Sequence, residues 1–115
     1  MNTRETVQKY LDSIHNGFQS LLTDDVKFTS FTSPVRSVAG KAAYIAATNK
    51  FYSKVASFEV RDLIVDANRA CALTRYEIRG KDGGTFTSDV AEVFTVQNGK
   101  IDSLAIYFDL TPYPR

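Results

Sequence analysis

Apolar residues recur with two different periods along this chain, and the change of period predicts helices that give way to strands. Near the N-terminus they are spaced as on one buried face of a helix, at Val7, Tyr10, Leu11, Ile14 and Phe18. Thr3 is a suitable residue to begin this helix, and Asn16-Gly17 is a suitable pair to end it. A short helical turn over residues 18–22 and an alanine-rich second helix over residues 40–53 are expected next.

Five runs rich in valine, isoleucine, phenylalanine, tyrosine and threonine predict strands. They span residues 26–32, 58–65, 70–79, 85–96 and 101–108. The last four follow one another with short connections, which favours an antiparallel meander. Helices combined with such a sheet indicate an α+β fold.

Two dipeptides, Asp82-Gly83 and Asn98-Gly99, are strong signals for tight turns between these strands. A type I′ turn needs positive φ at both central residues, and these residue types tolerate it. As two-residue loops they would fix the register of the sheet, and the first would place Leu73 opposite Glu92. A turn at Gly83-Gly84 instead would shift that register by one residue and reverse the faces of the central strands.

With two-residue turns, one face of the sheet carries both apolar and charged side chains. These include Leu73, Arg75, Glu77, Val90, Glu92, Phe94, Tyr107 and Asp109. The opposite face is also largely apolar, whereas a solvated antiparallel sheet would be polar on one side. The helices can cover only one of these faces, so we expect a homodimer through the outer sheet face.

The charged residues of the first face are candidates for catalysis. Glu77 and Asp109 would lie in one row across neighbouring strands, with Arg75 two residues along the same face. Arg75 can hold one carboxylate ionised while an apolar wall raises the pKa of the other, so the pair would supply an acid and a base. The alternative is that Arg75 forms only a structural ion pair with one of these carboxylates.

Two further residues have more than one possible role. Glu92 is either a desolvated pocket acid or the partner of Arg75. Tyr10 lies in the apolar stripe of the first helix, and it is either a core residue with a satisfied hydroxyl or a hydrogen-bond donor to a pocket. We predict that the pocket wall contains Phe31, Tyr44, Leu73, Val90, Phe94 and Tyr107.

The composition is that of one folded domain over residues 1–115, with 43% hydrophobic and 12% aromatic residues. Fourteen basic and thirteen acidic residues give a net charge of +1, which argues against binding to nucleic acid or an anionic membrane. With one cysteine, Cys71, and one histidine, the chain has no disulfide or zinc ligand set, so we expect no metal and a cytoplasmic location. The first thirty residues hold charges and no long apolar run, so neither a signal peptide nor a membrane span is expected.

Short motifs occur along the chain in an order that is typical of one known superfamily. They are Val7-Gln8-Lys9-Tyr10-Leu11, Asn16-Gly17, Thr23-Asp24-Asp25-Val26-Lys27-Phe28, Gly40 before a helix, the run from Glu92 to Ile101, and Tyr107-Phe108-Asp109. Together they resemble the nuclear transport factor 2-like superfamily, most closely its SnoaL-like branch, over nearly the whole chain. The resemblance implies a cone-shaped fold in which a curved antiparallel sheet wraps around N-terminal helices and an internal apolar pocket, and commonly a homodimer.

Two enzymatic branches of this superfamily can be compared with the chain position by position. Ketosteroid isomerase-like proteins surround the substrate oxygen with a tyrosine and a protonated carboxyl, which Tyr10 and Glu92 match, but their carboxylate base falls at about Ser30. Limonene-epoxide hydrolase-like proteins use an Asp-Arg-Asp trio, which Arg75-Tyr76-Glu77 and Asp109 match with Glu for one Asp.

The resemblance therefore implies a pocket for a small, mostly apolar organic molecule. The chemistry it implies is general acid–base catalysis on a carbonyl or epoxide, without a cofactor, as in an isomerase, cyclase or hydrolase. Fold alone does not decide between chemistries, because members of one fold family differ in their sites. The alternative is a non-catalytic ligand-binding or dimerisation module of the same fold.

Overall fold

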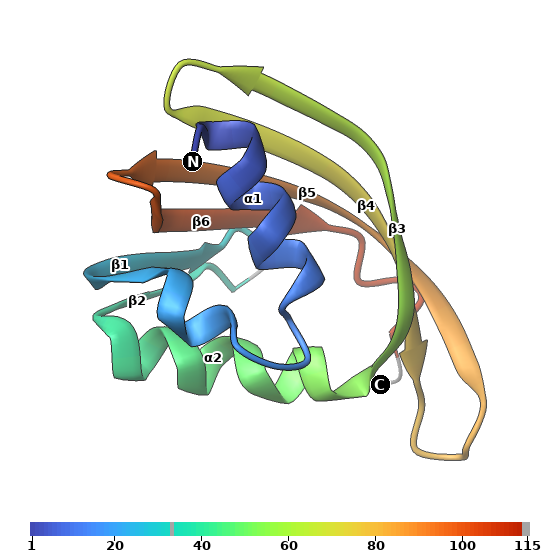
Figure 1. The fold of residues 1–115 in the computed structure, drawn as a ribbon. Coiled ribbons are helices and arrows are strands. Elements are labelled where there is room, and N and C mark those ends of the chain that lie inside the picture. The colour runs from blue at the N-terminus through green and yellow to red at the C-terminus, as the bar shows by residue number, and fades with distance from the viewer. Residues whose placement is uncertain (33, 114–115) are drawn as a thin grey trace.

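The computed structural model describes residues 1–32 and 34–113 as a curved sheet with helices packed against its concave side (Figure 1). Helix α1 spans Thr3–Asp12, the short 3₁₀ helix η1 spans Phe18–Leu21, and helix α2 spans Lys41–Lys54. The predicted α+β class and the sheet wrapped around helices are confirmed. The predicted bounds of α2 differ from the observed ones by one residue at each end.

Six strands form one sheet in the order β2-β1-β6-β5-β4-β3. Their bounds are Leu22–Ser30 for β1, Arg36–Ala39 for β2, Val55–Asp66 for β3, Arg69–Arg79 for β4, Thr85–Gln97 for β5 and Lys100–Phe108 for β6. The sheet keeps two open edges, at β2 and β3, and does not close into a barrel (Figure 1). Strand β2 has only four residues, which is too short a run to show a period in the sequence.

One strand pair of the sheet is parallel. Strands β1 and β6 run parallel, while every other neighbouring pair is antiparallel. The antiparallel meander expected for the last four strands is observed in β3 to β6, and the parallel pair lies outside it. Alternation within a strand reports which side chains are buried, and it carries no information about the direction of a neighbour that is distant in sequence.

Helix α1 is capped at its N-terminus by Asn2 and is shorter than the apolar stripe predicts. The Asn2 side chain accepts a hydrogen bond from the Glu5 N–H at 2.8 Å, and Glu5 Oε1 accepts one from the Asn2 N–H at 3.2 Å. This reciprocal capping box makes Asn2, and not Thr3, the residue that starts the helix. The helix ends at Asp12, and Gly17, with a φ of 98°, lets the chain turn so that Phe18 is buried.

The turn between β4 and β5 differs from the predicted one by a single residue. The Gly80 N–H donates to the Gly84 carbonyl at 2.7 Å, so that three residues, 81–83, form the loop. Gly83 takes the left-handed conformation with a φ of 84°, and the Asp82 carboxylate accepts from the Gly84 N–H at 3.0 Å. This is the geometry of a three-residue hairpin loop with a left-handed glycine, and Asp82 does not need the positive φ of a type I′ turn.

The turn between β5 and β6 is the two-residue turn that the sequence predicts. Asn98 and Gly99 both have positive φ, of 52° and 75°. A bulge next to this turn then shifts the register, so that Glu92 lies opposite Ile106 and not opposite Ala105 as a regular hairpin predicts.

These two changes of register redistribute the side chains between the faces of the sheet. Leu73 lies opposite Ala91, and Arg75 lies opposite Asp89, on the face turned away from the helices. Glu92 lies opposite Ala72 on the inner face. The prediction that Arg75, Glu77 and Glu92 share one face is therefore wrong, because a shift of one residue moves every side chain of a strand to the other side.

Candidate functional site

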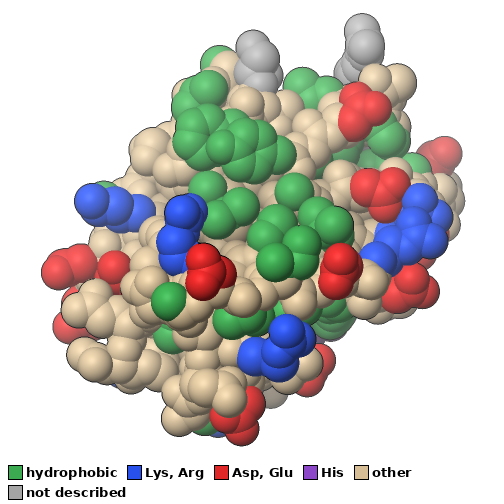
Figure 2. Space-filling model, turned by 90° about the horizontal axis from the view of Figure 1, so that it is seen from above, with side chains coloured by type: hydrophobic (Ala, Val, Ile, Leu, Met, Phe, Trp, Pro, Cys, Tyr) green, Lys and Arg blue, Asp and Glu red, His purple; other side chains and the backbone are tan. Residues whose placement is uncertain are grey.

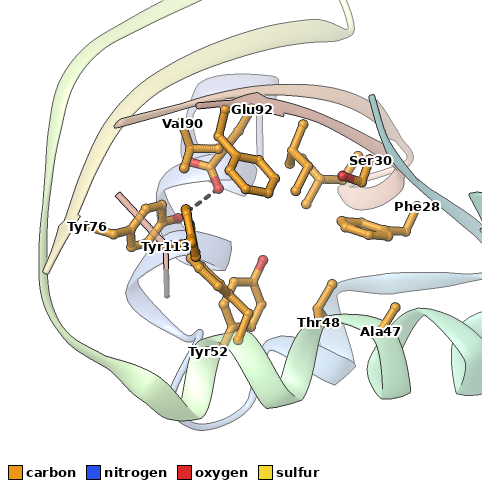
Figure 3. A pocket seen from close by; sticks show the side chains of 13 residues that line it. Phe28, Ser30, Ala47, Thr48, Tyr52, Tyr76, Val90, Glu92 and Tyr113 are labelled. Atoms are coloured by element: carbon orange, nitrogen blue, oxygen red, sulfur yellow. Dashed lines mark hydrogen bonds between the residues drawn. The ribbon is translucent and has the colours of Figure 1, made fainter. Parts of the chain in front are cut away.

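A cavity of about 230 Å³ lies between α2 and the inner face of the sheet (Figure 3). Figure 3 shows Thr48 and Tyr52 rising from α2 toward Val90 and Glu92 of β5. Most of the remaining wall is apolar, with side chains such as Phe28, Leu104, Ile106 and Phe108. The sequence places these side chains here because β1, β5 and β6 each turn alternate residues toward the helices.

Glu92 is the acidic residue of this cavity, and its exposed fraction is 2%. Its Oε2 accepts a hydrogen bond from the Tyr76 hydroxyl at 2.7 Å. Its Oε1 has no hydrogen-bond partner among the described residues, and the same is true of Thr74 Oγ1 on the neighbouring strand. A buried carboxyl with one unused oxygen costs free energy, so it is unusual unless a ligand, a water or a proton satisfies it.

Burial raises the pKa of Glu92 from 4.5 to about 7, and two nearby hydroxyls offset part of that rise: that of Thr74, which lies close without a well-formed hydrogen bond, and that of Tyr76, which donates one. Desolvation dominates because the charged form loses its hydration, while the two hydroxyls can stabilise a carboxylate only in part. At neutral pH this carboxyl therefore exists in both protonation states. A group with a pKa close to the working pH is well suited to accept and return a proton.

Three tyrosine hydroxyls form a chain next to the cavity. The Tyr10 hydroxyl lies 2.6 Å from that of Tyr44 and 2.6 Å from that of Tyr52. All three side chains are buried, and burial is the main reason that the pKa of Tyr10 and of Tyr52 lies well above its ordinary value. Three phenolic protons serve two hydrogen bonds in this chain, so one O–H is left to donate elsewhere. Tyr52 is the member of the chain that lines the cavity.

The C-terminal segment covers one side of the cavity with Tyr113. Its hydroxyl lies 2.7 Å from Ser88 Oγ, and its ring packs against Phe86 and Phe108 with ring centres 5.0 and 5.2 Å apart. Asp109 holds the preceding turn, because its Oδ1 accepts from the N–H and the hydroxyl of Thr111 at 2.9 and 2.7 Å. These two hydrogen bonds also lower the pKa of Asp109.

The predicted site residues fall into three places. Val90 and Glu92 line the cavity. Tyr10, Tyr44 and Phe94 are fully buried behind it and do not line it. The remaining ones, Phe31, Leu73, Arg75, Glu77, Tyr107 and Asp109, lie outside it.

The charged residues outside the cavity each have a local partner. Arg75 Nε donates to Asp89 Oδ1 at 2.8 Å on the outer face, and Glu77 Oε1 accepts from the Thr87 hydroxyl at 2.8 Å. Asp109 follows the end of β6, and its carboxylate accepts a hydrogen bond from the Thr111 N–H. The structure thus does not bring Arg75, Glu77 and Asp109 together in the cavity, because the register turns Arg75 and Glu77 to the outer face and Asp109 lies beyond the end of β6. Arg75 forms an ion pair, as the structural alternative proposed, but its partner is Asp89 and not Glu77 or Asp109.

Beyond Val90 and Glu92, most of the cavity wall was not predicted by the sequence, and the residues it did not place there include Tyr52, Tyr76 and Tyr113. Tyr76 was placed on the opposite face by the one-residue shift in the first hairpin. Phe51 and Tyr52 were expected on the second helix, but α2 shows no clear apolar stripe that would point to its inner side. The position of Tyr113 depends on the turn at Asp109, which has no signal in the pattern of strands.

No group of three or more His, Cys, Asp or Glu side chains that could hold a metal ion is present in residues 1–32 and 34–113. Among the same residues, no helix is long and apolar enough to cross a membrane.

The sequence of residues 7–104 matches the family described as the SnoaL-like domain. This chain belongs to the SnoaL-like family. The match confirms the resemblance seen in the motifs, and it places this SnoaL-like protein in the nuclear transport factor 2-like superfamily, whose members include isomerases and cyclases. A comparison with curated proteins finds no match to this sequence.

Solved structures show the same fold at low sequence identity. A protein from Jannaschia sp. CCS1, provisionally described as a SnoaL-like polyketide cyclase, is 15% identical with a TM-score of 0.79, over 94% of this chain and 85% of that one. A provisionally described isomerase from Rhodopseudomonas palustris is 13% identical with a TM-score of 0.78, over 90% and 89%. An NTF2-like protein of unknown function from Cytophaga hutchinsonii is 19% identical with a TM-score of 0.74, over 97% and 94%. At these identities the comparison supports the fold alone.

Proposed function

We propose that this SnoaL-like protein binds a compact, mostly apolar organic molecule in the cavity and moves a proton of that molecule with Glu92. The observation that carries this proposal is the unpartnered Oε1 of a carboxyl that is buried in the wall of an apolar cavity. A structural acid at this depth would be expected to have both oxygens satisfied. A proton-transferring acid needs one oxygen free for its substrate.

The size of the cavity limits the ligand. A dry apolar cavity of about 150 Å³ accepts one benzene ring. The cavity of about 230 Å³ is larger than that and smaller than the pockets that take drug-sized ligands. The body of the ligand is therefore one substituted ring or two small fused rings, with at most a few polar atoms.

The chemistry follows from the groups that face the cavity. In its ionised form Glu92 can take a proton from a carbon next to a carbonyl, and the electrons of that C–H bond form the C=C bond of an enolate. As the C=C bond forms, the π electrons of the carbonyl move onto its oxygen. The Tyr52 hydroxyl can donate its hydrogen bond to the enolate oxygen. Glu92, now protonated, returns the proton to the same or a different carbon. Return of the proton to a different carbon completes an isomerisation, and return to the same carbon gives proton exchange. Proton removal alone is the first half of a ring-closing condensation, and none of these steps uses a cofactor.

Hydrolysis of an epoxide by a trio of charged residues is not part of this proposal, because Arg75 and Glu77 lie on the outer face. The alternative function is binding without catalysis in the same cavity. It would use the same apolar walls and would leave the proton of Glu92 unused.

The exchange of α-protons of a small ketone tests the proposal. With 2-tetralone in D₂O at pD 7.5, we expect the protein to accelerate loss of the α-proton signals in NMR spectra over the buffer rate. Glu92→Gln should reduce this acceleration by about 10²-fold or more, as removal of a general base does. Glu77→Gln is the matched control, because it makes the same change on the outer face and should exchange at the rate of the native protein.

Two outcomes would contradict the proposal in different ways. Binding of 2-tetralone, seen as shifts of cavity resonances, without accelerated exchange would support the non-catalytic alternative. Equal rates for Glu92→Gln and the native protein would exclude Glu92 as the base.

We also propose a homodimer through the outer sheet face. Two adjoining rows of side chains cross this face, Ile64–Cys71–Val93–Ala105 and Leu73–Ala91–Tyr107. Ile64, Leu73 and Tyr107 are exposed by 55%, 40% and 49%. Figure 2 shows hydrophobic side chains gathered on this side of the molecule with acidic and basic ones around them. An apolar centre within a rim of both charges suits an isologous contact with a second copy.

The cell compartment is a smaller part of the proposal. Cys71 is free and half-buried on β4, so this chain has no disulfide that would need an oxidising environment. A reducing compartment keeps such a thiol unmodified. We propose the cytoplasm.

A further inference from the structure

A groove of about 640 Å³ adjoins the cavity on the other side of Tyr113. The cavity and the groove share Ala47, Phe51 and Tyr113 as wall residues. The rest of the groove is formed by the second half of α2 and by the end of β4 with its turn. The cavity and the groove therefore lie next to each other along α2, and the three shared side chains separate them.

The charged residues in the wall of this groove are all basic. They are Lys50 and Lys54 of α2, Arg79 at the end of β4, and Lys81 in the turn. None of these four forms an ion pair within the described part of the chain. The nearest acid in sequence, Asp82, has a carboxylate oxygen bonded to the Gly84 N–H. Four cations around one groove repel each other, and an anion in the groove would remove that repulsion.

Helix geometry explains only part of this cluster. Lys54 lies in the last turn of α2, where a cation interacts favourably with the negative end of the helix dipole. Arg79 and Lys81 belong to β4 and its turn, so the dipole does not account for their position at the same groove.

The charges of the two hollows have opposite signs. Glu92 is the acidic group in the wall of the cavity, and the four basic side chains lie in the wall of the groove. An anionic group inside the cavity would face the Glu92 carboxyl in a dry environment, which is unfavourable. The same group in the groove would lie among cations that are still in contact with water.

Resting on the function proposed above, we propose that the ligand is an amphipathic organic anion. Its apolar body fills the cavity next to Glu92, and its carboxylate, sulfonate or phosphate group lies in the basic groove beyond Tyr113. Thr48 lines the cavity and Lys54 the groove, and six residues of helix separate them by about 9 Å along the axis. The anionic group is therefore joined to the apolar body by a short flexible linker.

A pair of probes that differ only in charge tests this inference. The probes are 4-phenylbutyrate and 4-phenylbutan-1-ol, which carry the same ring and linker. Titration of the ¹⁵N-labelled protein with each probe, followed by NMR, gives both the dissociation constant and the residues that shift. We expect the carboxylate to bind at least about threefold more tightly than the alcohol, since each exposed charge pair adds little. Signals of Leu104 in the cavity and of Lys50 at the groove should shift together.

Charge-neutral variants localise the effect. Lys50→Gln combined with Lys81→Gln should remove most of the preference for the carboxylate and leave the affinity for the alcohol unchanged. The matched control is Lys27→Gln combined with Lys100→Gln, two exposed lysines that do not line the groove. This control has the same net charge and should keep the preference.

The outcomes separate this inference from the proposed function. Two results would contradict the anionic group in the groove and leave the proposed cavity ligand unaffected. One is equal affinity of both probes for the cavity. The other is a control pair that lowers the preference as much as the groove pair does. If neither probe shifts the cavity signals, the proposed ligand class fails together with the inference.

Discussion

Glu92 has one carboxyl oxygen bonded to Tyr76 and one without a partner, and its burial with an unbonded oxygen distinguishes it from the more exposed acids whose contacts are described above. Asp89 and Asp109 are exposed and held by Arg75 and Thr111, and the pKa of each lies below its usual value because of those hydrogen bonds. In Glu92 burial dominates and raises the pKa to about 7. The carboxyl that can hold a proton at neutral pH is therefore the one that lines the cavity.

The raised pKa of Glu92 predicts how stability changes with pH. The folded state binds the Glu92 proton more tightly than the unfolded chain does, so this contribution is complete below pH 4.5 and is lost as pH rises through about 7. The difference between the pKa of Glu92 in the folded protein and in the unfolded chain corresponds to about 3 kcal/mol. Urea unfolding between pH 4 and pH 8 gives the free energy of unfolding of the native protein and of Glu92→Gln. The change with pH in the difference between these two free energies is the contribution of the Glu92 proton. A difference that stays constant over this range would contradict the raised pKa.

The chain of tyrosine hydroxyls predicts unequal roles for its members. Tyr52→Phe removes the hydroxyl that faces the cavity, and it should lower the 2-tetralone exchange rate by about 10²-fold, as loss of one oxyanion donor does. Tyr44→Phe leaves Tyr10 and Tyr52 bonded to each other, so its exchange rate should stay near that of the native protein. Equal losses in the two variants would show that the chain serves stability and not donation into the cavity.

Among the elements, the turn between β4 and β5 has the largest consequence for the site. A three-residue loop turns Tyr76 toward the helices and Arg75 away from them, whereas a two-residue loop would do the opposite. The sequence offered two-residue turns at Asp82-Gly83 or at Gly83-Gly84, and the three-residue loop over residues 81–83 was not predicted. The first helix was predictable from the period of its apolar residues, and the second helix and five of the strands were predictable from their residue types, because both signals are local. The hydrogen bond between Gly80 and Gly84 thus determines whether Glu77 or Tyr76 lies on the same face of the sheet as Glu92.

The conformation of Gly83 predicts the effect of replacing it. At a φ of 84° a Cβ is strained even though it would meet no atom within 4 Å. Gly83→Ala should therefore lower the free energy of unfolding by about 1 kcal/mol. Gly83→Asn, a residue that tolerates this region better, should lose less. Urea unfolding monitored by circular dichroism gives both values, and an unchanged stability for Gly83→Ala would contradict the left-handed turn.

For the whole molecule, the helices cover only the concave face of the sheet. The sequence predicts a homodimer from two apolar faces, and the structure reverses the assignment of residues to those faces in β4 and β6 relative to β5. The outer face nevertheless carries Leu73 and Tyr107 in one row. The apolar character survives the reversal because β4 and β5 have small or apolar side chains on both sides. The parallel pair of β1 and β6 could not be predicted, because it joins segments that lie far apart in the sequence.

The proposed dimer predicts that one charge on the outer face separates the protomers. Leu73→Glu places a carboxylate in the apolar centre of the contact, so it should yield a monomer in light scattering coupled to size exclusion. Ala46→Glu adds the same charge at an exposed position of α2 and should leave the mass unchanged. A native protein that is already monomeric at high micromolar concentration would contradict the dimer.

A ¹³C-detected NMR titration of the side-chain carboxyls measures the protonation of Glu92 directly. We predict that the Glu92 carboxyl titrates with a pKa of about 7, while the pKa of Asp109 in the same sample lies below its usual value. Glu92→Gln assigns the signal, because the high transition should disappear in that variant. A Glu92 transition at or below about 4 would show a solvated or paired carboxylate. It would remove the basis for proton transfer in the cavity.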